Sequence, residues 1–146
     1  MIRRCRFAKL GEMSAPGETD LELMLASLEV ARRPGEFTYV SVRVPTPGLL
    51  AAAQAMVVEE GLSSLVVSVS AAQRAGLPVS VTLAWLTLTV QSSLEAVGLT
   101  AVVARRLADE DIPCNVLAGY LHDHVLVPLD RVDEAAAAIV GDRAGG

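Results

Sequence analysis

One short run gathers the residues that could bind a metal ion. His122 and His124 flank Asp123, and they are the only two histidines of the chain. In an extended strand alternate side chains share a face, so the two imidazoles would lie together and Asp123 would point away. Cys114 could be a further ligand across a hairpin, but a closed zinc site takes four ligands. We therefore prefer a hydrogen-bonded hairpin start that fixes strand register, and we expect no metal and no cofactor, with His122 and His124 only as candidate ligands.

Catalysis has little support among the other reactive side chains. Cys114 lies between Pro113 and Asn115 at an expected strand start, where a small thiol is usually structural, although a histidine could in principle activate it. Glu59 and Glu60 are adjacent in an expected turn, so they would diverge rather than converge as an acid–base pair must. The sequence also lacks a phosphate loop, a dinucleotide fingerprint and a nucleophile elbow. We expect a protein that is not an enzyme.

Composition and charge exclude further classes of function. The 146 residues are 52% hydrophobic, 20% charged and 3% aromatic, with a net charge of -5, which suits one ordinary domain or two small ones. An acidic chain with few aromatic residues argues against binding to nucleic acid. Mean hydropathy is high at +0.45, but the longest apolar stretches, Leu62–Val69 and Val79–Val90, are far shorter than the roughly 20 residues of a membrane-spanning helix. We therefore expect no nucleic-acid partner and no membrane association.

The two cysteines, Cys5 and Cys114, are too few for a disulfide framework, which favours a reduced, cytoplasmic location. Residues 1–15 are a basic N-terminal extension, with no apolar stretch that would make a secretory signal. Two interpretations of this extension stay open. Either Met13 is the true start and residues 1–12 are an upstream extension, or Arg3–Leu10 forms an edge strand.

The first half predicts helix, strand, strand and short helix. A capping box at Thr19–Glu22 begins a helix that Arg33-Pro34-Gly35 ends. Leu49–Met56 is alanine-rich and ambiguous. The remaining predicted elements are the strand Phe37–Val44, the turn Glu59–Gly61, the strand Ser64–Val69 and a short helix at Ala71–Ala75.

The second half predicts strand, helix, strand, strand and helix. The elements are Val81–Val90, an amphipathic helix Gly98–Asp111, the hairpin strands Pro113–Tyr120 and His122–Val127, and a helix Val132–Val140 capped by Asp130. This order makes most of a ferredoxin-like βαββαβ unit, and the first half is similar. The sequence thus predicts an α+β fold of two tandem units, residues 16–80 and 81–141, with a tail at 142–146.

Particular motifs carry a family resemblance over about residues 16–140. The second half reads WLTLTVQSSLEAVGLTA at 85–101, IPCNV at 112–116 and GYLHDHVLVP at 119–128, and the first half has GETDL at 17–21, PGEF at 34–37 and EEGL at 59–62. This resembles a family of small bacterial tandem ACT-like proteins of unassigned function. The family has a histidine where this chain has Gln91, and the basic extension lies outside its pattern. The resemblance implies two ACT-like units packed as a pair, as in the regulatory portions of aspartate kinases.

The resemblance also implies a ligand site, because ACT domains bind small effectors, commonly amino acids, where the first strand passes into the first helix. Amides and the dipole at a helix start suit a carboxylate. Gly98 allows close approach of the backbone, and the predicted donors are Ser92, Ser93, Gly98 and Leu99. Asn115 would read the ligand through its side chain. The alternative is that Ser92 and Glu95 form a capping box and Gly98 only a tight turn.

The predicted function is therefore a non-enzymatic regulatory protein that binds an amino acid. The alternative is a structural or protein-interaction module with an ACT-like fold and no ligand. ACT-type sheets often pair edge to edge, and with the high apolar content this favours a homodimer.

Overall fold

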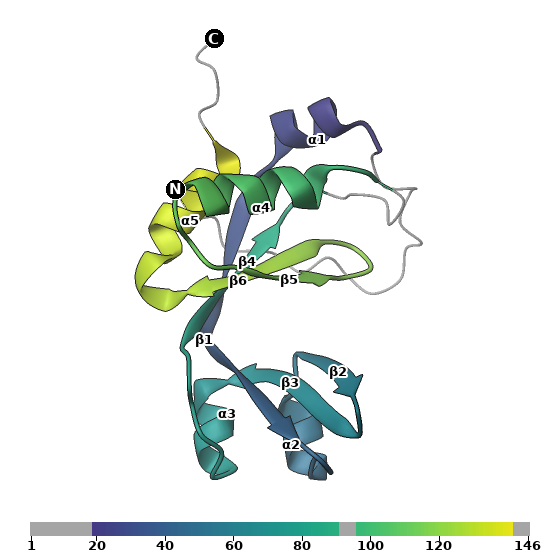
Figure 1. Ribbon diagram of the computed structural model, residues 1–146, viewed down its shortest axis with the longest axis vertical. Helices are drawn as coiled ribbons and strands as arrows, with labels where there is room; N and C mark the ends of the chain where they lie inside the picture. The colour runs from purple at the N-terminus through teal and green to yellow at the C-terminus, as the bar shows by residue number, and fades with distance from the viewer. Residues whose placement is uncertain (1–18, 91–95, 142–146) are drawn as a thin grey trace. The chain divides into compact units, whose positions relative to one another are not determined.

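The computed structural model describes residues 19–90 and 96–141 (Figure 1). The helices are α1 (Leu21–Ser27), α2 (Pro47–Ala52), α3 (Val69–Arg74), α4 (Leu99–Asp109) and α5 (Val132–Val140), with a short 3-10 helix η1 at Leu129–Arg131. The strands are β1 (Val30–Val42), β2 (Ala55–Glu59), β3 (Leu62–Ser68), β4 (Leu83–Leu88), β5 (Asn115–Ala118) and β6 (Asp123–Pro128). The predicted α+β fold is confirmed. The basic extension and the tail at 142–146 lie outside the described residues.

The described residues form two compact units. The central unit is residues 34–84, and the terminal unit comprises residues 19–33, 85–90 and 96–141. The boundaries expected from the sequence, 16–80 and 81–141, assign each element to a unit by its position along the chain. The compact units instead group residues 19–33 with the second half of the chain.

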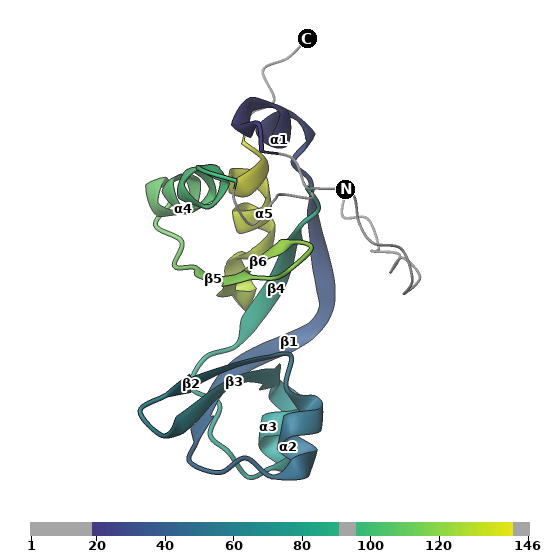
Figure 2. The same ribbon diagram turned by 90° about the vertical axis from the view of Figure 1, so that its right-hand side faces the viewer.

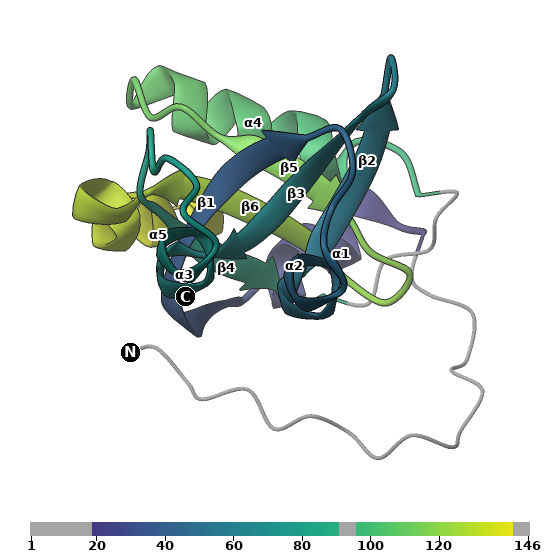
Figure 3. The same cartoon turned by 90° about the horizontal axis from the view of Figure 1, so that it is seen from below.

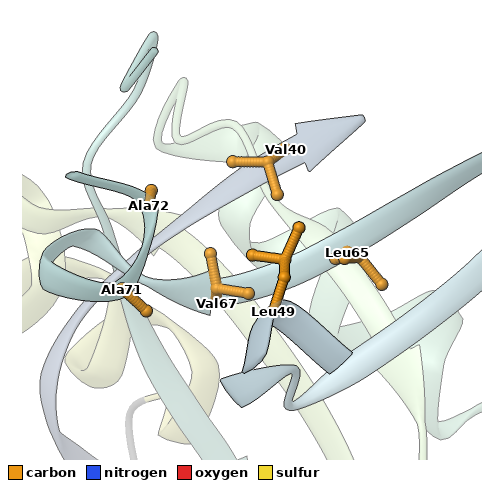
Figure 4. Close-up of a cluster of buried hydrophobic side chains, with 6 residues drawn as sticks. All are labelled: Val40, Leu49, Leu65, Val67, Ala71 and Ala72. Atoms are coloured by element: carbon orange, nitrogen blue, oxygen red, sulfur yellow. The ribbon is translucent and has the colours of Figure 1, made fainter. Parts of the chain in front are cut away.

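The central unit is a sheet with two short helices on one face. Its strands follow the order β2-β3-β1, and both pairings are antiparallel (Figure 3). Thr46 and Ser68 accept hydrogen bonds from the first turns of α2 and α3, so side chains fix where both helices begin. A buried cluster joins the helices to the sheet (Figure 4): Val40, Leu49, Leu65, Val67, Ala71 and Ala72.

The terminal unit has the strand order β1-β4-β6-β5, in which β1 enters only through Val30–Arg33. Helices α4 and α5 contact each other, and α5 contacts β6 (Figure 2). Arg106 of α4 donates hydrogen bonds to the carbonyl oxygens of Ile139 (2.6 Å) and Val140 (3.1 Å) at the end of α5. The core of this unit comes from the inner faces of its strands and helices: Leu86, Leu88, Val103, Leu107, Val125, Val127, Ala135 and Ile139 are all buried.

The prediction that the first helix runs to Arg33-Pro34-Gly35 is wrong. Helix α1 ends at Ser27, and β1 starts at Val30 and continues through Pro34 and Gly35 to Val42. Proline and glycine usually interrupt a strand, but both are tolerated at irregular positions, and Gly35 has the left-handed φ of +107° that such a position allows. A single strand therefore supplies residues to both units.

Two predicted caps are also wrong. Asp20, not Thr19, is the N-cap of α1, because its carboxylate accepts from the amides of both Glu22 and Leu23. Asp130 lies inside η1, so the N-cap of α5 falls on Arg131, without a side-chain hydrogen bond. The ambiguous stretch at 49–56 divides between α2 and β2.

None of the helices in the described ranges is both long enough and apolar enough to span a membrane.

Candidate ligand site at the start of α4

Gly98 is the N-cap of α4 and occupies a position that favours glycine for two reasons. Its φ is +106°, in the left-handed region that other residues avoid. A Cβ at residue 98 would also lie 2.8 Å from Cδ2 of Leu21, in α1. The tight-turn role considered for Gly98 is therefore present, and the side chain of Leu21 packs directly on it.

Among the residues that the structure describes, no side chain caps the amides in the first turn of α4. Glycine has no side chain to accept from them, and the first turn contains no acidic residue. Helices α1, α2 and α3 each have a side-chain oxygen in this role. The first-turn amides at the positive end of an eleven-residue helix can bind a carboxylate. The capping box predicted at Ser92 and Glu95 lies outside the described residues.

The predicted ligand residues divide between the two ends of α4. Gly98 and Leu99 lie together at its start; the Leu99 side chain is only 3% exposed, so this residue can offer its amide alone. Asn115 opens β5 and is exposed. Figure 1 shows β5 starting near the end of α4 and running back towards its start, and eleven residues of helix span roughly 16 Å. Ser92 and Ser93, like Gln91, lie outside the described residues.

Two features of the terminal unit were missed from the sequence. The first is the contact of Leu21 with Gly98. The second is the turn that joins β5 to β6. In that turn Tyr120 and Leu121 are exposed, and the Gly119 amide donates to the His122 carbonyl at 3.0 Å. The signal available in the sequence was the pair of apolar residues Tyr120 and Leu121 directly before the polar run His122–His124.

His124 is held against β4. Its Nδ1 lies 3.0 Å from Oγ1 of Thr87, and its ring centroid lies 5.2 Å from that of Trp85. The Arg33 guanidinium lies 5.0 Å from the Trp85 ring centroid. Burial lowers the pKa of His124, and the positive charges of His122 and Arg33 lower it further. The His124 imidazole thus makes a side-chain hydrogen bond to β4, and its surroundings favour the uncharged form.

Within residues 19–90 and 96–141, no three histidine, cysteine, aspartate or glutamate side chains lie close enough together to hold a metal ion. Burial raises the pKa of the Asp123 carboxyl, and His122 partly offsets this. Burial also raises the pKa of the Cys114 thiol, which reduces its thiolate fraction. The geometry therefore supports neither a zinc site at His122 and His124 nor an activated cysteine.

A separate hollow of about 360 Å³ lies in the central unit. Its lining is uncharged: Tyr39, Val40, Ser41, Ser64, Leu77, Pro78 and Ser80. Burial raises the pKa of the Tyr39 phenol, so this group stays protonated. Without a cationic group the hollow is poorly suited to a carboxylate, and the start of α4 is the better candidate site.

Comparison with known proteins supports this fold. No curated protein matches the sequence. A crystal structure of a Vibrio cholerae protein of unknown function, described as a possible transport protein, is 38% identical, with a TM-score of 0.73, and the match covers 82% of this chain and 92% of that one. An Agrobacterium tumefaciens protein is 15% identical, with a TM-score of 0.56 and coverage of 77% and 86%.

Aspartate kinase from Clostridium acetobutylicum shares the fold at 11% identity, with a TM-score of 0.55; the match covers 76% of this chain but only 33% of the kinase. The ACT domain family matches twice, over residues 16–84 and 80–140. These matches confirm the tandem arrangement predicted from the motifs. The chain belongs to the ACT domain family.

Proposed function

We propose that this protein is a non-enzymatic regulatory protein that binds an amino acid at the start of α4. ACT domains commonly serve regulation by binding amino acids, and this chain has two of them. The observation that carries the proposal is the first turn of α4, whose N-cap Gly98 has no side chain that could accept from its amides and which contains no acidic residue. An α-carboxylate supplies the charge and the acceptors that this helix end lacks.

The ligand contacts proposed for the described part of the site are main-chain amides. Gly98 brings the backbone close, and Leu99 contributes its amide while its side chain stays in the core. The hydroxyls of Ser92 and Ser93 are proposed as further donors. Asn115 as the side-chain reader remains a prediction, since it opens β5 near the other end of α4.

Leu21 connects the proposed site to other elements of the terminal unit. Its side chain packs on Gly98, and α1 leads directly into β1. A ligand at Gly98 would have a different affinity for states with Leu21 in place and displaced, and only such a difference can shift a conformational equilibrium. We also propose that the protein is a cytoplasmic homodimer without a nucleic-acid partner, in agreement with its acidic composition.

The test is a thermal-shift screen of the full chain against the twenty amino acids, followed by titration calorimetry of any that stabilise it. A ligand at a hundredfold excess over its Kd stabilises the native state by about 2.7 kcal/mol. Thr100→Asp places a carboxylate in the exposed first turn of α4, so we expect it to abolish the shift, whereas Thr100→Val at the same position preserves it. No shift from any amino acid would overturn the proposal, and a shift that survives Thr100→Asp would move the site elsewhere.

Separate variants test the remaining ligand residues. Ser92→Ala and Ser93→Ala should each weaken binding if these hydroxyls donate to the ligand. If Asn115→Ala no longer binds the amino acid, the Asn115 side chain contacts the ligand. If binding is unchanged, Asn115 is not a ligand residue. Titration calorimetry of each variant with the same amino acid distinguishes the cases.

The second candidate function is an interaction module without a ligand. The contact between Leu21 and Gly98 favours it, because an apolar side chain already covers part of the helix start. The variant Leu21→Ala uncovers Gly98 and distinguishes the two candidate functions. If an amino acid stabilises this variant but not the natural chain, the site is blocked by Leu21 and the module interpretation holds.

A further inference from the structure

The hollow of the central unit, about 360 Å³ in volume, has a different chemistry from the site proposed at the start of α4. Four hydroxyl-bearing side chains line it: Tyr39, Ser41, Ser64 and Ser80. Its other lining residues are apolar, and none of the lining residues carries a charge. Pockets that bind small molecules have volumes of about 300–1,000 Å³ and an apolar lining with a few polar groups. The hollow therefore has the size and the composition of a small-molecule site.

Strands β1 and β3 bring three of these hydroxyls together. Ser41 pairs directly with Ser64 in the antiparallel register, and directly opposed side chains lie on the same face of a sheet. Tyr39 precedes Ser41 by two residues, so its side chain lies on that face as well. The alternate residues Val40 and Leu65 belong to the buried cluster beside α2 and α3 (Figure 4). The three hydroxyls therefore lie on the face of the sheet away from these helices.

The segment between α3 and β4 supplies the other wall of the hollow. Gly76 follows α3 in a left-handed conformation, with a φ of +66°. Its amide donates to the Gln73 carbonyl at 3.0 Å, and the Leu77 amide donates to the Ala72 carbonyl at 2.9 Å. These two bonds are those of a Schellman motif, which fixes the path of the chain out of a helix. Leu77 also packs against the buried cluster, and Pro78 has a fixed φ, so this wall is in place before any ligand binds.

The course of residues 77–80 explains why a hollow remains beside β1. These residues are not a strand, because β4, the neighbour of β1 in the strand order, begins only at Leu83. Pro78 has no amide hydrogen to donate to a neighbouring strand. Ser41 and Ser80 are exposed, whereas the other two hydroxyl-bearing residues are partly buried. A ligand can therefore enter from solvent beside the exposed serines.

The lining selects against an anionic ligand. An ionised group would lose hydration in the hollow without meeting a lining charge of opposite sign. The Ser64 hydroxyl donates to the Glu59 carboxylate at 2.7 Å, so the nearest charge on this side is negative and disfavours an anion further.

The same lining suits ligand hydroxyl groups, which both donate and accept hydrogen bonds. Because Ser64 donates to Glu59, its oxygen is left to accept from a ligand. Burial raises the pKa of the Tyr39 phenol, so this group stays protonated and can donate. Leu77 and Pro78 offer apolar contacts to the carbon-bound hydrogens of a ligand.

We propose that the hollow of the central unit binds a neutral polyhydroxy compound of monosaccharide size. A water molecule takes about 30 Å³ in the liquid, so the hollow has room for a ligand of about a dozen heavy atoms, as in a hexose. This site is separate from the one at the start of α4, because residues 34–84 form one compact unit and Gly98 belongs to the other. Loss of amino-acid binding would leave polyol binding intact, and the reverse also holds.

The first experiment records proton–nitrogen correlation spectra of the full chain during titration with glucose, galactose, ribose or inositol. We expect at least one of these neutral compounds to shift the amide signals of Tyr39, Ser41, Ser64 and Ser80 in a saturable manner. Glucuronate and glucosamine, which add a negative or a positive group to the glucose ring, should bind more weakly than the best neutral compound. The proposal is overturned if none of the four neutral compounds shifts these signals, or if a charged sugar or an amino acid shifts them at lower concentration.

A bulky substitution blocks the hollow. Ser80→Trp places an indole at an exposed position of its wall, so we expect the Kd of the bound polyol to rise by about tenfold or more. Ser70→Trp makes the same exchange at an exposed serine of α3 that is not part of the lining, and it should leave the Kd unchanged. Undiminished binding in Ser80→Trp, or an equal loss in both variants, would place the polyol outside the hollow and overturn the proposal. Circular dichroism of each variant checks that it is folded.

A milder substitution tests one hydrogen bond without changing the shape of the hollow. Tyr39→Phe removes only the phenol hydroxyl, so the Kd of the same polyol should rise about threefold to tenfold, the usual effect of one hydrogen bond. The matched control is Tyr120→Phe, at an exposed tyrosine of the terminal unit, which should have no effect. Equal affinities of Tyr39→Phe and the natural chain would contradict the role of the phenol as a donor.

Discussion

Leu21 packs on Gly98: a Cβ at residue 98 would lie 2.8 Å from Cδ2 of Leu21. This contact joins α1, near the start of the described residues, to the N-cap of α4. It also places an apolar side chain against Gly98, next to the amides proposed to bind the ligand. The glycine proposed to let a ligand approach the backbone is thus also the residue on which a neighbouring helix packs.

Gly98→Ala should destabilise the protein by about 1–3 kcal/mol, the cost of a left-handed conformation in a residue other than glycine, with the steric conflict at Leu21 in addition. The measurement is urea denaturation followed by circular dichroism. Gly48→Ala is the control, because a Cβ there meets nothing within 4 Å, and alanine is favoured in a helix such as α2. If both substitutions had the same effect, the special role of Gly98 would be refuted.

A double-mutant cycle separates the two causes at residue 98. Leu21→Ala removes the steric conflict but not the strain in φ, so part of the destabilisation by Gly98→Ala should disappear in the Leu21→Ala background. The two substitutions would then be non-additive. Strict additivity would show that Leu21 and Gly98 do not interact.

Stability should fall as the pH drops below about 6.5. The folded protein lowers the pKa of His124 from its ordinary value of 6.5, so the unfolded chain binds a proton at a pH where the folded chain does not. Stability is complete above pH 6.5 and declines below it until the lowered pKa is reached. Asp123, whose pKa is raised from 3.8, acts in the opposite direction at more acidic pH.

The check is the free energy of unfolding measured from pH 8 to pH 5, with His124→Gln beside it. This variant removes the titrating group and should flatten the dependence, while His122→Gln should retain most of it. An unchanged slope in His124→Gln would assign the dependence to another group.

Thr87→Val should cost about 0.5–1.5 kcal/mol, the usual contribution of one hydrogen bond, because it removes the hydroxyl 3.0 Å from Nδ1 of His124. The substitution preserves shape and tests the bond between β4 and β6. Chemical denaturation at pH 7.5, where His124 is neutral, gives the value. Thr100→Val on the exposed surface of α4 is the control and should change stability by less than about 0.5 kcal/mol; a comparable loss in both would contradict the prediction.

Arg106→Met should destabilise the protein by about 1–2 kcal/mol. The side chain keeps its length but no longer donates to the Ile139 and Val140 carbonyls at the negative end of α5. Its exposed neighbour Arg105 allows a matched control, and Arg105→Met should have little effect. Thermal unfolding of the two variants tests this, and equal melting temperatures would show that the bonds to α5 contribute nothing measurable.

The site could be predicted only in part from the sequence. Gly98 and Leu99 do lie at the start of the second ACT helix, because a glycine before an amphipathic run is a local signal of a helix boundary. The place of Asn115 at the start of β5, away from that helix start, depends on which way the strand runs under α4. No local sequence pattern near residue 115 indicates the direction in which β5 runs relative to α4. His124 was identified as a hydrogen-bonding group, but its partner Thr87 is 37 residues away and was not.

The sequence by itself determined the elements whose signals are local. The turn at Glu59–Gly61 follows from its glycine, and α5 spans the predicted Val132–Val140 because alanines and apolar residues at helical spacing favour it. Only the tertiary structure decided that β1 passes through Pro34 and Gly35 and supplies residues to both units. A strand forms there because its neighbours in the sheets provide hydrogen bonds and burial, which outweigh the local preference of proline and glycine for a break.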